Sequence, residues 1–507
     1  MKRFLIPLLV LLPLMTVAQE KIMVIADPHV FPQTEIAKVS DFDSYMAKQR
    51  KMIDVSEPIW HALMDTALAY RPSLVLIPGD LTRDGEQASH DTVSASLLRL
   101  QEAGIRTLVI PGNHDLPGAN WESLYPGTYE NAVKDPNSFS YAVSPLPGVT
   151  VLGIDGSHGN AGPGSLSTAS LRWILAQADS AAARNSTVIA MCHWQLIEHF
   201  DQQGSLESAC RLANADAIRD SLMHHGVHLV LTGHFHVNSI STYRDTTGVT
   251  TDSIVEISTG SPITYPCPYR WLTISADKSE INVETDYLTS VADIADLYAY
   301  SRNWMAEHTR NMVPSLALKA WGKVDSMWDS KVVPAMTAAG LGTTLINMIK
   351  SGLPQNDEDR IDITDRNLGA AAVNLYLFHS DANENERPEM GRQLADSVYN
   401  GLKAMINEAL GLYAIIVGPV FSAMAVVMAK EAVESMIEDR TQWYSQNFSD
   451  VTNDLQLSLT VNAPQIPSAV ETIEEGSDFP NKFIRNGRLF IRRGTSIYNA
   501  SGNRVAE

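Results

Sequence analysis

The 507-residue sequence predicts an α/β layered fold, followed by a helical bundle and a short β-hairpin tail. Between residues 21 and 287, short runs of Val, Ile and Leu alternate with longer segments of helical periodicity. Helical periodicity alone then continues to about residue 449. The predicted organisation is a signal peptide over 1–18, an α/β domain over 19–289, a helical bundle over 290–460, and a linker with a hairpin tail over 461–507.

The first 18 residues predict a signal peptide that is cleaved before Gln19. Lys2 and Arg3 supply a positive start, residues 4–15 an apolar stretch, and 16–18 a small-residue end. The apolar stretch is shorter than the ~20 residues of a membrane span, although an uncleaved anchor is the alternative. We therefore expect an exported protein that is periplasmic, attached to the cell surface or secreted.

Composition excludes some partners. With 38 Lys and Arg against 58 Asp and Glu, the net charge of −20 argues against binding a nucleic-acid duplex, which needs clustered cations for the phosphates. Cys192, Cys210 and Cys267 are too few for a disulfide framework and match no zinc-binding spacing. We expect Cys192 to be a buried thiol, and a disulfide between Cys210 and Cys267 stays open.

The α/β region predicts its elements in order. Six apolar runs predict buried strands at 21–26, 73–78, 107–111, 149–154, 187–192 and 229–232. Amphipathic helices are predicted between most of them, at 56–70, 89–103, 167–183 and 214–225. Closely spaced strands at 240–243, 253–258, 270–274 and 280–287 then predict a second, mostly antiparallel sheet that completes the core.

Two features of the C-terminal half leave alternatives open. Residues 410–429 carry no charge, but Gly418-Pro419 interrupts them, which favours a buried bundle core over a membrane span or a lipid-facing helix pair. Residues 482–499 alternate around Asn486-Gly487 and are basic, which predicts a hairpin. This tail resembles the C-terminal strand modules of some exported bacterial proteins, which act as sorting or attachment signals; an added edge hairpin is the alternative.

Five polar motifs follow predicted strands, at the edge where open α/β sheets place their sites. They are Asp27-Pro28-His29, Gly79-Asp80, Gly112-Asn113-His114-Asp115, His193 and Gly233-His234-Phe235-His236. Their carboxylate, amide and imidazole donors suit Mn, Fe or Zn and are numerous enough for two ions, with Asp80 able to bridge. Two ions ~3.5–4 Å apart clamp a phosphoryl group and make a bridging hydroxide available at neutral pH.

In this order the motifs resemble those of the calcineurin-like metallophosphoesterases, over residues 21–287. The resemblance implies a four-layer α-β-β-α sandwich and two divalent or mixed-valence metal ions. It implies that one ion is held by Asp27, His29 and His236 and the other by Asn113, His193 and His234, with Asp80 bridging the two. It also implies that Asn113 and His114 bind phosphate oxygens. His114 is then the acid, and Asp115 orients its ring. The implied activity is phosphoester hydrolysis by the bridging hydroxide.

Further stretches narrow the resemblance. Residues 80–90 and 258–266, together with the helical region, resemble the bacterial class III cyclic-nucleotide phosphodiesterases. Many relatives have His-His where this chain has His193-Trp194, so Trp194 is a candidate stacking face for the substrate. His199 is a second candidate, either lining the pocket or lying on a helix surface. We expect the loops 31–51, 156–164 and 200–210 to form the pocket walls.

These observations predict an exported phosphodiesterase acting on a small cyclic-nucleotide-like or lipid head-group-like phosphoester. A phosphomonoesterase or nucleotidase using the same site is the main alternative, because monoester and diester differ by one substituent that loops, rather than metal ligands, accept. A surface binding protein without catalysis is the third reading. The sequence leaves open the identity of the metals, the oligomeric state and any membrane contact.

Overall fold

The computed structural model describes residues 19–116, 120–157, 164–199, 208–245 and 252–327, short pieces between 329 and 397, residues 454–460, and four strands between 482 and 505. The chain divides into two compact units, residues 1–464 and 465–507.

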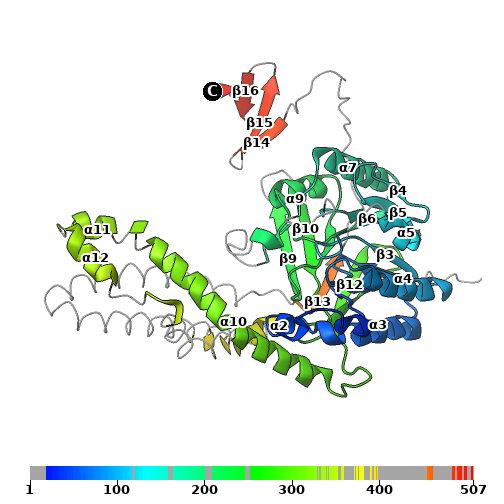
Figure 1. Ribbon diagram of the computed structural model, residues 1–507. Coiled ribbons are helices and arrows are strands. Elements are labelled where there is room, and N and C mark those ends of the chain that lie inside the picture. The colour runs from blue at the N-terminus through cyan, green and yellow to red at the C-terminus, as the bar shows by residue number, and fades with distance from the viewer. Residues whose placement is uncertain are drawn as a thin grey trace, which may run out of the picture. The chain divides into compact units, whose positions relative to one another are not determined.

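The first unit contains two sheets (Figure 1). In spatial order the six-stranded sheet consists of β13 (Gln456–Thr460), β12 (Glu280–Tyr287), β11 (Pro268–Ile274), β1 (Glu20–Val24), β2 (Leu74–Ile77) and β3 (Arg106–Val109). The seven-stranded sheet consists of β4 (Val133–Lys134), β5 (Tyr141–Leu146), β6 (Val149–Ile154), β7 (Thr187–Cys192), β8 (Leu229–Thr232), β10 (Asp252–Ser258) and β9 (Ser239–Asp245).

Helices cover the outer face of each sheet. The helices α3 (Ser56–Tyr70) and α4 (Gln87–Glu102) pack on the six-stranded sheet, and α7 (Thr168–Ala183) and α9 (Ala215–His224) pack on the seven-stranded sheet. Because side chains alternate along a strand, β1 sends Ile22 and Val24 into the core between the sheets and Met23 into the core under the helices. The predicted four-layer α-β-β-α sandwich is therefore confirmed.

Shorter elements complete the α/β region. They are α1 (Gln33–Ile36), α2 (Phe42–Met46) and the 3-10 helix η1 (Ile53–Val55) before α3, α5 (Trp121–Leu124) and α6 (Pro126–Tyr129) after β3, and the 3-10 helix η2 (Ser208–Cys210) before α9.

The ten strands and four helices predicted for the α/β region are all present, but the predicted separate second sheet is wrong. β9 and β10 join the seven-stranded sheet, where β10 pairs with β8 in parallel, whereas β11 and β12 join the six-stranded sheet, where β11 pairs with β1. The strands β4 and β5 were not expected. A local pattern predicts that a segment is a strand, but partner choice depends on contacts distant in sequence.

The region after β12 is helical where the structure describes it. It contains α10 (Leu297–Met327), α11 (Val333–Ala338), α12 (Thr343–Ser351) and further helical residues up to 397. The predicted bundle boundary at 460 is wrong, since residues 456–460 form β13 and pair with β12. No helix among the described residues is long and apolar enough to cross a membrane. Residues 1–18 and 410–429 lie outside the described part of the chain.

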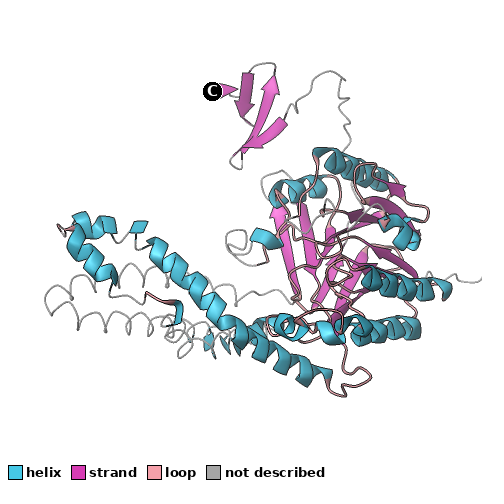
Figure 2. Cartoon of the chain, in the orientation of Figure 1, coloured by secondary structure: helices cyan, strands magenta, loops and turns pink. Residues whose placement is uncertain are grey.

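The second unit is a four-stranded antiparallel sheet, coloured as strand in Figure 2. Its strands are β14 (Lys482–Arg485), β15 (Arg488–Arg493), β16 (Ser496–Asn499) and β17 (Arg504–Val505). β14 and β15 pair with Arg485 opposite Arg488, so the predicted hairpin around residues 486–487 is confirmed. The two additional strands extend it into a meander.

Candidate metal centre

All five motifs lie directly beyond the carboxyl ends of strands. Those containing Asp27, Asp80 and Asn113 follow β1, β2 and β3 of the six-stranded sheet, and those containing His193 and His234 follow β7 and β8 of the seven-stranded sheet. The two sheets thus present their functional edges to each other, and the candidate site is shared between them.

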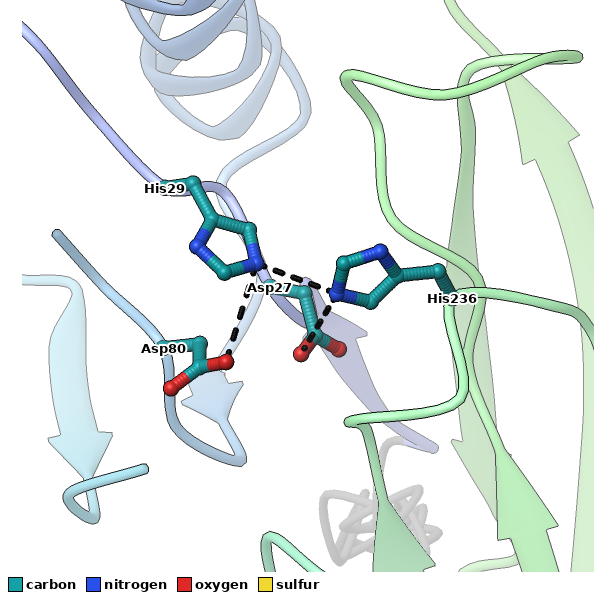
Figure 3. A group of neighbouring side chains, drawn as sticks. All are labelled: Asp27, His29, Asp80 and His236. Atoms are coloured by element: carbon teal, nitrogen blue, oxygen red, sulfur yellow. Dashed lines mark hydrogen bonds and ion pairs between the residues drawn. The ribbon is translucent and has the colours of Figure 1, made fainter. Parts of the chain in front are cut away.

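A first donor group consists of Asp27, His29, Asp80 and His236 (Figure 3). One ligand atom from each lies within 4.8 Å of all the others. The Nε2 atoms of His29 and His236 are 3.0 Å apart. His29 Nε2 is 3.6 Å from Asp80 Oδ2, and His236 Nε2 is 3.4 Å from Asp27 Oδ1. Nitrogen and oxygen donors therefore converge on one point.

A second donor group consists of Asp80, His193 and His234. His193 Nε2 lies 3.2 Å from Asp80 Oδ2, 3.1 Å from His234 Nδ1 and 3.1 Å from Asn113 Oδ1. Asp80 belongs to both groups, because its Oδ1 accepts a hydrogen bond from His114 N while its Oδ2 faces His29 and His193. The geometry places Asp80 where a bridging ligand would have to be.

The backbone adopts an uncommon conformation at five of these donors. The left-handed φ values are 51° at Asp27, 40° at His29, 52° at Asp80, 65° at His234 and 62° at His236. Non-glycine residues rarely adopt this region, and such residues cluster at functional sites where the surrounding structure holds them.

The motif glycines allow the donors to approach one another. A Cβ at Gly112 would lie 2.2 Å from Asp80 Oδ1, and one at Gly233 would lie 2.3 Å from Asp27 Oδ2. Any larger residue at these positions would displace a carboxylate of the site, so the glycines of these two motifs have a steric role.

Hydrogen bonds outside the site orient two of the imidazoles. His193 Nδ1 donates to Pro78 O at 2.9 Å, and His234 Nε2 donates to Ala209 O at 3.1 Å. The ring nitrogens that face the site are therefore Nε2 of His193 and Nδ1 of His234, and each can bind a metal through its lone pair when it carries no proton.

Burial sets the protonation of the histidines. It lowers the pKa of His29 and His236, and burial together with the charge of His193 lowers the pKa of His234 to about 3. His193 differs: burial lowers its pKa, but the Asp80 carboxylate outweighs this and raises the pKa to about 9. The site without metal therefore holds a proton between His193 and Asp80, and the other three rings are neutral ligands.

The donor set fits two metal ions. The Nε2 atoms of His29 and His236 face each other at 3.0 Å while the low pKa of both rings keeps them neutral, an arrangement that suits a shared cation. Imidazole and carboxylate donors of this kind accept Mn, Fe or Zn.

Comparisons with known proteins agree with this geometry. Residues 20–238 match the family described as Calcineurin-like phosphoesterase. This part of the chain is similar to the calcineurin-like phosphoesterases. The match spans all five motifs, and it supports the metallophosphoesterase resemblance without reaching the class III phosphodiesterase group. No curated protein sequence matches the chain.

Matches among solved structures include two phosphatases. A dimetal phosphatase from Danio rerio is 16% identical with a TM-score of 0.42, over 52% of this chain and 95% of that one. A purple acid phosphatase from yellow lupin seeds is 12% identical with a TM-score of 0.37, over 55% and 53%. A Thermus thermophilus protein is 12% identical with a TM-score of 0.28, over 53% and 99%.

The structure departs from the sequence prediction at the partner of His114. His114 Nδ1 pairs with Asp84 Oδ1 at 2.8 Å, and not with Asp115. The buried Asp115 carboxylate instead accepts hydrogen bonds from Thr82 N and Gly112 N, at 2.9 and 2.8 Å. Asp115 thus closes the turn that begins at Gly112, while the side chain of its neighbour His114 points to Asp84. Partial burial opposes ionisation of Asp84, but His114 outweighs it and lowers the Asp84 pKa.

The predicted substrate contacts of Trp194 and His199 are also wrong. Trp194 is fully buried and packs edge-on against His193 at 4.9 Å, so it supports a ligand and offers no open stacking face. The His199 side chain is neither in an open pocket nor on a surface: it is 1% exposed and its Nε2 lies 3.0 Å from Glu256 Oε1.

Glu256 is a site-supporting residue that the sequence analysis missed. It is completely buried in β10, and its Oε2 accepts the N–H groups of Leu196 and Ile197, both at 2.8 Å. Its Oε1 accepts the hydroxyl of Thr232 at 3.0 Å. It therefore holds the segment that follows His193. A charged residue within an apolar strand was the available signal.

Two further expectations concern loops and cysteines. All three cysteines are described, and none forms a disulfide bond. Residues 31–51 are described and contain α1 and α2, whereas residues 158–163 and 200–207 of the other two predicted pocket walls lie outside the described part of the chain.

Proposed function

We propose that this protein is an exported, metal-dependent phosphodiesterase that hydrolyses a small phosphodiester. The observation that carries the proposal is the pair of donor groups that share Asp80. In this proposal one ion is held by Asp27, His29 and His236, the other by Asn113, His193 and His234, and Asp80 bridges them. Export rests on the predicted signal peptide at residues 1–18.

Two divalent ions bound there would polarise the phosphoryl oxygens and supply an activated water at neutral pH. The protein's own acid is His114, which is 29% exposed and lies with its ring edge-on to His29 at 4.8 Å. Because Nδ1 is occupied by Asp84, Nε2 is the atom that gives a proton to the leaving oxygen. Asp84 holds the ring in place.

Preference for a diester is supported by where the class III-like stretches lie. Residues 80–90 contain Asp84, the partner of His114. Residues 258–266 reach the first donor group, since Ser261 Oγ donates to Asp27 O at 2.7 Å and Thr264 Oγ1 to His236 O at 3.4 Å. A cyclic-nucleotide-like or lipid head-group-like diester is therefore the proposed substrate class, and a phosphomonoesterase or nucleotidase on the same residues is the second candidate.

The test is metal-dependent hydrolysis of bis(p-nitrophenyl) phosphate and p-nitrophenyl phosphate by residues 19–507, with Mn, Fe or Zn added. Asp80→Asn is expected to lose both activity and bound metal. His114→Ala is expected to lose about 10²–10⁴-fold in kcat while keeping its metal, because it removes only the acid. The matched control is His61→Ala, an exposed histidine of α3 that is expected to behave as the wild type.

The outcomes separate the candidates. A higher kcat/KM on the diester supports the proposal, and a higher value on the monoester favours the phosphomonoesterase. Tight metal binding without turnover on either ester would instead indicate a non-catalytic surface protein.

A further inference from the structure

Asp84, the partner of His114, lies in an exposed turn and is not held by burial. Its side chain is 47% exposed, and its Oδ1 lies 2.8 Å from His114 Nδ1. An exposed carboxylate can rotate among several staggered conformations, and only some of these bring an oxygen to the imidazole. Asp84 can therefore fix the His114 ring only if another group fixes Asp84.

The neighbouring residue Arg83 supplies such a group. Its Nε lies 3.5 Å from Asp84 Oδ2, whereas the other oxygen of that carboxylate meets His114. The two oxygens of Asp84 thus have different partners, and the guanidinium favours the conformation in which both contacts are made. Because an ion pair near the surface is weak when both side chains can move, this contact depends on how firmly Arg83 is held.

The Arg83 side chain is held by two other residues. Its Nε donates to Glu86 Oε1 at 2.6 Å, and its Nη2 lies 2.6 Å from the same oxygen. Its guanidinium carbon lies 3.9 Å from the ring centre of Phe31, a contact that favours one orientation of the planar group. Only 12% of the Arg83 side chain is exposed, so it has much less freedom than that of Asp84.

The backbone of the turn is held as well. Arg83 N donates to Val30 O at 3.3 Å. Glu86 Oε2 accepts hydrogen bonds from Asp84 N at 3.0 Å and from Ser89 Oγ at 3.2 Å. Glu86 therefore binds the side chain of Arg83 with one oxygen and the backbone of Asp84 with the other, and it fixes the two residues relative to each other.

We propose that Arg83 is a positioning residue that acts on His114 through Asp84 and touches neither substrate nor metal. Its guanidinium selects the Asp84 conformation that meets His114 Nδ1, while Glu86 and Phe31 keep the guanidinium in place. The His114 ring is then oriented before the substrate binds. This inference rests on the proposed function, in which His114 is the acid.

A double-mutant cycle with the metal-loaded protein and bis(p-nitrophenyl) phosphate tests this role. Arg83→Gln is expected to lower kcat about fivefold, the size of one partly exposed ion pair, and to leave KM and metal content unchanged. The double variant of Arg83→Gln and Asp84→Asn is expected to have the kcat of Asp84→Asn alone. The control is Arg99→Gln, because Arg99 is a 55% exposed arginine of α4 that pairs with Asp65.

Three results would overturn the proposal. The first is a kcat of the double variant about fivefold below that of Asp84→Asn, which would mean that Arg83 acts independently. The second is a raised KM with unchanged kcat in Arg83→Gln, which would make Arg83 a substrate-binding residue. The third is equal kcat in Arg83→Gln and Arg99→Gln. If Arg83→Gln does not fold, Arg83→Lys, which keeps the charge but lacks the forked geometry, takes its place in the cycle.

Crystal structures of the wild type and of Arg83→Gln separate this role from the proposed function. Asp84 is expected to meet His114 in the wild type and to leave it in Arg83→Gln, and an unchanged Asp84–His114 hydrogen bond in the variant would contradict the proposal. If the wild type hydrolyses neither ester, the proposed function fails, while a displaced Asp84 in Arg83→Gln still supports Arg83 as the residue that positions it.

Discussion

Glu256 offers a quantitative test of how the metal centre is supported. Replacing it by Ala removes the acceptor of two buried backbone N–H groups, those of Leu196 and Ile197. Each buried donor left unpaired costs about 1–3 kcal/mol, so the pair predicts a loss of about 2–6 kcal/mol in the free energy of unfolding. Thr232 and His199 are left out of this sum, because a hydroxyl rotates and an imidazole can change its tautomer.

Glu256→Gln separates the role of the acceptor from that of the charge. One amide oxygen can still accept both N–H groups, while the NH₂ group faces Thr232 and His199, both of which can accept. The predicted loss is therefore only about 1–2 kcal/mol, which reflects the weaker, uncharged hydrogen bonds.

The assay is urea unfolding of the metal-free protein, with metal affinity as a second readout. Glu284→Ala is the control, because Glu284 is exposed on β12 and its loss should change stability by less than about 0.5 kcal/mol. Because the segment held by Glu256 directly follows His193, metal affinity should fall in Glu256→Ala. If Glu256→Ala unfolds at the same urea concentration as Glu284→Ala, the buried hydrogen bonds do not stabilise this segment.

Three further predictions address the site itself. Gly112→Ala should abolish metal binding without unfolding the chain, because its Cβ would lie 2.2 Å from Asp80 Oδ1. The control Gly322→Ala, whose Cβ would have no atom within 4 Å, should retain the metal. Equal metal content in the two variants would contradict the steric role of Gly112. Asp84→Asn should lower kcat by about tenfold or more, since it replaces the carboxylate that holds the His114 ring; an unchanged kcat would exclude Asp84 as a positioning residue. Metal affinity should rise as the pH increases toward about 9, because the Asp80 carboxylate raises the pKa of His193 and the His193 proton must leave before a metal binds. Calorimetry in buffers of different ionisation enthalpy measures this proton release. A constant metal affinity between neutral pH and pH 9 would contradict the prediction.

The layered fold and the metal centre follow largely from sequence. Apolar runs such as those of β1 and β7 identify buried strands, since a continuous Val, Ile and Leu pattern has few other interpretations. Motifs placed directly after such strands lie at the same edge of their own sheet, because parallel strands align their carboxyl ends. That the two sheets bring their motifs together around Asp80 was implied by the resemblance to the metallophosphoesterases.

The contacts that tune the site were decided by tertiary structure. The family resemblance implied Asp115 as the partner of His114, yet Asp115 accepts a hydrogen bond from Gly112 N and Asp84 pairs with the ring. Glu256 supports the segment after His193 from β10, which lies 60 residues beyond Leu196 and 59 beyond Ile197 along the chain.

The loop 31–51 is likewise held by a distant segment, since Trp304 Nε1 of α10 donates to Gln49 O from 255 residues downstream. The same distinction explains why strands were predicted correctly and their sheets were not. Local periodicity determines which faces are apolar and where polar motifs stand along the chain. Which side chains meet depends on the packing of segments that are distant in sequence. A local pattern carries no information about the free energy of that packing.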